Sequence, residues 1–134
     1  MKVKEGVNIY SGSKNGLAAS LTNPTELSYK KGNIKRHYPV EFREHKYRDA
    51  EAAFWKHGKK LSFEEQQKLC TEIIAAKLDQ YPELAKAIAR QGGVAWLKKC
   101  RHFTGARSET FKQWEGDGEN SVFIMCLINA YKRV

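Results

Sequence analysis

Two polar segments of this 134-residue chain carry the residue types that could do chemistry. The first lies in a helix predicted from Asp49 to about His57, where Glu51 stands at the edge of the apolar face. Trp55 and Lys59 lie close to Glu51 in angle, whereas Lys56 points away. Desolvation can raise the pKa of a carboxyl at such a margin, which suits catalysis. Most glutamates at the margin of an apolar helix face are simply solvated, so the position of Glu51 alone does not establish catalysis.

The second segment is the loop from Trp114 to Ser121, which precedes an amphipathic run from Val122 to Tyr131. Two glycines, an Asp and an Asn describe a tight polar turn that enters a helix, with Asn120 or Ser121 as the N-cap. Free backbone N–H groups at a helix start suit an anion or a sugar phosphate. The same residues also fit a plain loop and a terminal core helix.

The elements that must position these segments are predicted from periodicity, capping and turn residues. Ser62 and Glu65 form a capping box, and Pro82 suits the first turn of the next helix. Together the patterns predict a single α+β domain over residues 1–134, mainly helical, with a small antiparallel sheet near the N-terminus. Strands are expected at 7–10, 38–42 and 46–47, helical segments at 17–21, 49–57, 62–80, 82–91, 94–100 and 122–131, and no clear pattern at 26–38 or 101–113.

Composition limits the class of protein. The net charge is +9, and residues 30–60 hold ten Lys or Arg against four Asp or Glu, so polyanions or phosphorylated ligands are expected partners. No apolar run is long enough for a membrane span or a secretion signal, which predicts a soluble, cytoplasmic protein without membrane contact. The three cysteines are expected to be buried free thiols, and neither a metal nor a cofactor is expected.

Four segments, in order along nearly the whole chain, resemble motifs of the NADAR superfamily, which includes YbiA-like N-glycosidases and ADP-ribosyl-guanine glycohydrolases. The matched segments are Asn8–Ser11 with Leu21–Asn23, Tyr47–Phe54, Ala76–Leu84 and Trp114–Asn120. The chain departs from the family pattern at three points. Ala52 replaces the histidine after the glutamate, Glu115 is inserted after Trp114, and the family's lysine position falls on Gly58, one residue before Lys59.

The resemblance implies hydrolysis of an N-glycosidic bond at a phosphorylated ribose, through a cationic anomeric carbon. Glu51 would stabilise that charge and orient water, and Asp117 would position ribose hydroxyls or water. Lys59 would attack the opened sugar as an amine and form a Schiff base. Trp114 would wall the pocket, although it fits a core anchor equally well. The other substrate-binding residues implied by the resemblance are Ser11, Lys14, Asn23, Arg48, Trp55, Gly116, Gly118 and Asn120.

Three functions follow as expectations. The basic stretch favours removal of ADP-ribose from a nucleobase, guanine in DNA, over action on a free metabolite. An N-glycosidase acting on a riboflavin-biosynthesis intermediate is the alternative within the family. The displaced lysine and the missing histidine favour a third possibility, a non-catalytic module that binds ADP-ribose or nucleic acid.

Overall fold

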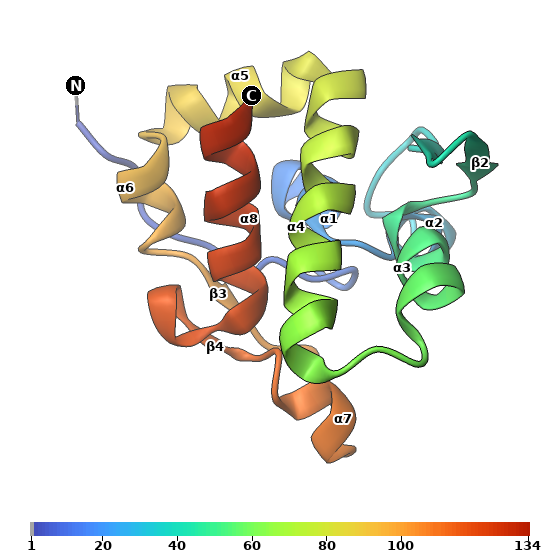
Figure 1. The fold of residues 1–134 in the computed structure, drawn as a ribbon. Coiled ribbons are helices and arrows are strands. Elements are labelled where there is room, and N and C mark those ends of the chain that lie inside the picture. Colours follow the sequence, from blue (N-terminus) through green and yellow to red (C-terminus); the bar gives the residue numbers. More distant parts are fainter. Residues whose placement is uncertain (1) are drawn as a thin grey trace.

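Two long helices lie side by side at the centre of the fold. The computed structural model describes residues 2–134. α4 (Phe63–Gln80) and α8 (Val122–Arg133) pack along their lengths, as Figure 1 shows. Ser62 caps α4 with the reciprocal capping box expected from the sequence, and Ser121 caps α8. Both long helices thus begin at a defined residue, and the shorter elements pack around them.

The remaining helices surround this pair (Figure 1). α3 (Ala50–Gly58) packs on α4, α6 (Val94–Leu97) packs on α8, and α5 (Pro82–Gln91) crosses one end. No helix formed by residues 2–134 has both the length and the apolar character needed to cross a membrane. The other helical segments are α1 (Gly16–Leu21), α2 (Thr25–Lys30), α7 (Glu109–Lys112) and the 3₁₀ turn η1 (Gly118–Asn120).

Two small antiparallel strand pairs complete the α+β fold. β1 (Val40–Phe42) pairs with β2 (His45–Tyr47), and the two residues between them have φ angles of 50° and 69°, as a tight two-residue hairpin turn requires. This confirms the predicted small sheet. β3 (Arg101–His102) pairs with β4 (Gly116–Asp117), a second pair that the sequence did not predict. Strands of two residues are too short to show alternation.

The sequence prediction was wrong in two other places. The strand expected at 7–10 is absent, and Asn8 forms only an isolated parallel bridge with Arg101. The stretch 26–38, expected to be irregular, contributes most of α2. The six residues of α2 are mostly polar and show no helical period, so they left no signal.

One lysine lies inside the core. Lys77, on α4, is 1 % exposed, and its Nζ donates to the carbonyl oxygens of Ser20 and Thr22, the latter at 2.8 Å. These carbonyls end α1, where helix carbonyls lack partners and a cation is favoured. Burial lowers the pKa of Lys77 to about 7, and the charge of Asp49 opposes this shift. Lys77 therefore ties α4 to the turn that follows α1.

We expect Lys77 to make the stability of the fold rise with pH above neutrality. Its pKa falls from the ordinary 10.5 to about 7 on folding, so between these values the unfolded chain binds more protons and higher pH favours the folded state. Lys77→Met removes this titration while keeping the side-chain length. The free energy of unfolding, from urea titrations at neutral pH and at about pH 9, should therefore rise more for the parent protein than for the variant.

The variant is also expected to be less stable at both pH values, because two buried carbonyls lose a donor, at about 1–3 kcal/mol each. An equal pH dependence in both proteins would mean that Lys77 stays charged in the fold.

Candidate functional site

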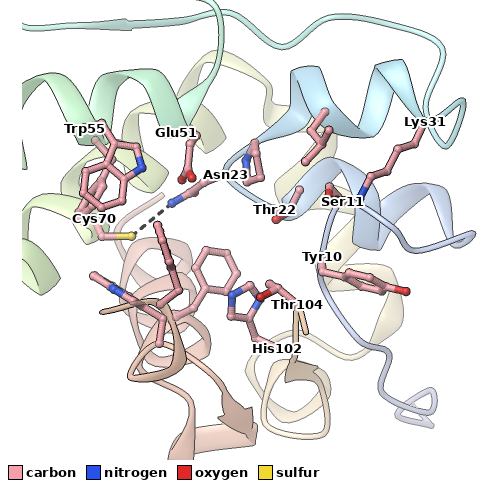
Figure 2. Close-up of a pocket in the computed structure, with 16 residues that line it drawn as sticks. Tyr10, Ser11, Thr22, Asn23, Lys31, Glu51, Trp55, Cys70, His102 and Thr104 are labelled. Carbon is pink, nitrogen blue, oxygen red and sulfur yellow. Dashed lines mark hydrogen bonds between the residues drawn. The ribbon is translucent and has the colours of Figure 1, made fainter. Parts of the chain in front are cut away.

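A cavity of about 270 Å³ lies where α3, the turn after α1 and the end of β3 meet (Figure 2). Sixteen residues line it, and they come from segments spread along the chain from Tyr10 to Phe123. Aromatic rings form much of the wall. The polar part of the lining includes Ser11, Asn23, Lys31, Glu51, His102 and Thr104.

Glu51 reaches this cavity because the start of α3 is tied to the turn after α1. Asp49 is the N-cap of α3, and its Oδ1 accepts from the Ala52 N–H at 2.9 Å. Its Oδ2 accepts from the Glu26 N–H at 3.1 Å, which links α3 to α2. The Glu51 N–H donates to the carbonyl oxygen of Asn23 at 3.2 Å. The first turn of α3 and the turn at Asn23 are therefore one unit, and both side chains line the same cavity.

Burial raises the pKa of the Glu51 carboxyl above its ordinary value of 4.5, because the charged form loses hydration. A hydrogen bond from the Trp55 side chain and the charge of Arg48 act in the opposite direction, while Asp49 adds to the rise. Once ionised, Glu51 is a poorly hydrated negative charge beside the cavity. Such a charge interacts more strongly with a developing cation than it would in water.

Asn23 leaves a hydrogen-bond acceptor unpaired in the cavity wall. The residue is 8 % exposed, and its Nδ2 donates to Cys70 Sγ at 3.5 Å, the dashed line in Figure 2. Its Oδ1 is fully buried and has no partner among residues 2–134. An unpaired buried acceptor costs about 1–3 kcal/mol, so a ligand hydroxyl or N–H group that reaches this atom is favoured.

The aromatic wall continues from α3 into α7 and the segment after it. Trp114 packs edge-to-face on Phe54 at 5.5 Å and on Phe63 at 5.2 Å between ring centroids. Trp55 meets Phe111 of α7 at 5.7 Å, and Phe111 is 46 % exposed. Trp114 is thus both a packing anchor and a wall of the cavity. Flat rings of this kind offer stacking surfaces to a base or a sugar.

Lys31 is the lysine in the cavity lining. Its Nζ donates to Ser11 Oγ at 3.1 Å, and Asn33 Nδ2 donates to the Ser11 carbonyl at 2.9 Å. Lys31 is otherwise exposed, so its ammonium keeps two N–H groups for an anion at the cavity edge. Lys14, named from the sequence for this role, is exposed and does not line the cavity.

The structure brings together only part of the residue set named from the sequence. Five of the twelve line the cavity, namely Ser11, Asn23, Glu51, Trp55 and Trp114. The other seven lie outside the lining, namely Lys14, Arg48, Lys59, Gly116, Asp117, Gly118 and Asn120.

The loop around Asp117 has a structural reason for its composition. Gly118 has a φ of +50°, and a Cβ there would lie 2.4 Å from the Lys98 carbonyl oxygen. Gly116, with a φ of +154°, is equally confined by the backbone of Asn120. Asp117 pairs with Arg101 in the β3–β4 ladder and is exposed. The loop turns the chain from β4 into α8, and its polar side chains do not reach the cavity.

Sequence reasoning missed several lining residues. Lys31 had one signal, its place in the basic stretch 30–60, which does not distinguish it from its neighbours. His102 and Phe111 come from the stretch 101–113, which has no readable periodicity. Cys70 was expected to be a buried free thiol, and it is one, but it also lines the cavity beside Asn23.

Comparison of the chain with models of known families, with curated proteins and with solved structures yields no match. Across the part of the chain that the structure describes, no three His, Cys, Asp or Glu side chains are grouped to hold a metal ion. The cavity and its side chains are therefore the basis on which we infer a function.

We expect Lys31 to contribute to anion binding at the cavity. Lys31→Gln should weaken the binding of ADP-ribose by about tenfold or more, since a hydrogen bond to a charged group contributes about 1.5–3 kcal/mol. Lys30→Gln is the matched control, because this exposed neighbour changes the net charge equally but does not line the cavity. Isothermal titration calorimetry gives both affinities, and equal affinities would contradict the assignment of Lys31.

Proposed function

We propose that this protein is an N-glycosidase of the NADAR type that removes ADP-ribose from a nucleobase, with guanine in DNA as the preferred substrate. The observation that carries the proposal is that Glu51, whose pKa burial raises, and Asn23 line one small, aromatic-walled cavity. The three free cysteines fit a reducing compartment, so we place this activity in the cytoplasm.

The cavity offers the groups that glycosidic cleavage needs. As the C1′–N bond breaks, its electron pair leaves with the base and positive charge develops at C1′. Glu51, as a carboxylate, would stabilise that charge; water would then add to C1′, and the proton that it loses would pass to the departing base. The Asn23 side chain would hydrogen-bond a ribose hydroxyl, and Lys31 with Ser11 would hold a phosphate at the edge.

The position of the lysines favours water as the nucleophile. Lys59 follows the end of α3, is exposed and does not line the cavity, so a Schiff base at this amine would require a change in the fold. Lys31 lines the edge, where its ammonium bonds Ser11. Direct hydrolysis needs no such rearrangement, and we therefore assign the attack to water.

The basic surface supports a nucleic-acid adduct as substrate. Lys35 and Arg36 are exposed in the basic stretch, and Arg36 lies over the Tyr38 ring at 4.5 Å. Exposed cations of this kind suit a phosphate backbone, although the Tyr38 ring beneath Arg36 is buried. The cavity volume favours the second candidate, a free phosphoribosyl metabolite of the riboflavin-intermediate kind, because about 270 Å³ holds a compact ligand.

Glu51→Gln keeps the shape of the side chain and removes its charge. We expect it to lower the rate of base release about a hundredfold or more, the scale of one electrostatic catalytic group, while ADP-ribose still binds. In the parent protein the rate should fall as the pH drops through the raised pKa of Glu51, above 4.5, because the carboxylate is lost. This acid limb should be absent in the variant. Chromatography of the free base released from an ADP-ribosylated oligonucleotide measures both effects.

Glu64→Gln is the matched control, since it removes the same charge at an exposed position of α4. Thermal melting checks that both variants fold. Normal turnover by Glu51→Gln would overturn the catalytic assignment of Glu51. A parent protein that releases no base from any ribosylated substrate, yet binds ADP-ribose, would be a non-catalytic binding module.

If the substrate is DNA, affinity for an ADP-ribosylated oligonucleotide should fall steeply with rising salt, because phosphate contacts release counterions. Lys35→Glu should flatten that dependence. Arg36 is a poorer choice, since its guanidinium also packs on Tyr38 and pairs with Glu83 at 3.5 Å. Lys86→Glu, on exposed α5 surface, controls for net charge. Fluorescence anisotropy over a salt series measures the slopes, and equal slopes for the two variants would favour the free metabolite.

A further inference from the structure

His102 is a buried polar side chain that the mechanism above leaves unused. It ends β3, is 9 % exposed and lines the same cavity as Glu51. Pairing with Gly116 of β4 fixes its backbone, and its ring stacks on Phe123 at 4.5 Å between centroids. Figure 2 shows His102 across the cavity from Glu51 and Asn23. A ring held this firmly has one orientation relative to a ligand.

One nitrogen of the ring is fixed by a backbone carbonyl. Nδ1 of His102 lies 2.6 Å from the carbonyl oxygen of Ile9. A carbonyl oxygen only accepts, so Nδ1 carries the hydrogen and donates it. Burial lowers the pKa of His102 below its ordinary 6.5, while this bond and the charge of Glu115 oppose the shift. In the neutral ring with its hydrogen on Nδ1, the other nitrogen, Nε2, has a free lone pair.

Nε2 has no hydrogen-bond partner in the part of the chain that the structure describes and is not fully buried. Nε2 makes no hydrogen bond within the described residues 2–134, and the fully buried unpaired side-chain atoms there are Asn23 Oδ1 and Thr25 Oγ1. Nε2 is therefore not sealed inside protein. Thr104 Oγ1, a hydroxyl of the lining, already donates to Glu115 Oε2 at 2.7 Å. Nothing in the wall supplies Nε2 with a hydrogen.

The inner cavity thus has acceptors on opposite walls, namely the Glu51 carboxylate and His102 Nε2. A ligand that fits them must offer donors on more than one side. Sugar hydroxyl groups meet this requirement, whereas an ionised phosphate carries acceptors alone and suits the cation Lys31 at the edge. The distribution of polar atoms places the sugar inside and the phosphate outside.

We propose that Nε2 of His102 accepts a hydrogen bond from a ribose hydroxyl group of the bound substrate. The proposal rests on the proposed function and adds to it a sugar-binding residue on the wall opposite Glu51. The 2.6 Å bond to Ile9 is then the positioning contact, since it fixes the ring so that Nε2 faces the sugar.

The first test uses the parent protein with ¹⁵N-labelled histidine and ADP-ribose as the probe. Before ligand is added, long-range ¹H–¹⁵N spectra should show His102 with a protonated Nδ1 and an unprotonated Nε2 near neutral pH. Saturation with ADP-ribose should move the Nε2 resonance in the direction of hydrogen-bond acceptance and leave Nδ1 protonated. A purely structural histidine would not respond in this way.

The second test uses a variant that keeps the structural bond. In His102→Asn, the side-chain amide can still donate to the Ile9 carbonyl, but nothing remains at the place of Nε2. Affinity for ADP-ribose should fall roughly tenfold, the loss expected for one hydrogen bond. His45→Asn, at an exposed position of β2 outside the cavity, should bind as the parent does. Thermal melting checks the folding of both variants.

The outcomes separate this inference from the proposed function. If ADP-ribose saturates the protein, as tryptophan fluorescence reports, but the Nε2 resonance does not move, the inference is overturned and the glycosidase proposal stands. If ADP-ribose does not bind at all, both are overturned. A shifted Nε2 resonance supports the inference even if His102→Asn fails to fold.

Discussion

The candidate site depends on the short backbone segment between α1 and α2, which is held from two sides. From α4, the buried amine of Lys77 donates to the carbonyls of Ser20 and Thr22. From α3, the Glu51 N–H donates to the carbonyl of Asn23. Neither bond involves the atoms that face the cavity. Together they set the distance between the Asn23 amide and the Glu51 carboxyl, because both side chains leave backbone that these bonds immobilise.

Burial shifts the pKa values of the acidic and basic groups of the cavity in opposite directions. Loss of hydration disfavours charge, so it raises the pKa of Glu51 and lowers the pKa of His102. The pKa of Cys70 is raised first by its interaction with the neighbouring Cys126 thiol and then by burial, so Cys70 stays a thiol. The walls are therefore weakly charged near neutrality apart from Glu51, once ionised, and Lys31 at the edge. A positive charge that develops inside would find in Glu51 its main counter-charge.

Much of the fold was predictable because it follows from local rules. The capping box at Ser62 set the start of α4, and Pro82 set the start of α5. The second strand pair and α2 were not predictable, since their residues show neither hydrophobic alternation nor a helical period. Glu51 and Asn23 were accessible to sequence reasoning through the motifs around them. His102 was not, because its role comes from a bond to Ile9, 93 positions away, which no local pattern encodes.

The four segments that resemble NADAR motifs have different local structures, yet they converge in space. Ser11, Asn23, Glu51 and Trp114, from three of them, line one cavity, and the fourth supplies Lys77, which holds the turn before Asn23. In the proposed function these side chains would act on one substrate, and Lys77 would hold the turn that carries one of them. The loop around Asp117 differs, because its residues match a motif but lie outside the cavity. The positive φ angles and close backbone contacts of Gly116 and Gly118 require glycine there, so these two residues serve the turn and not a ligand.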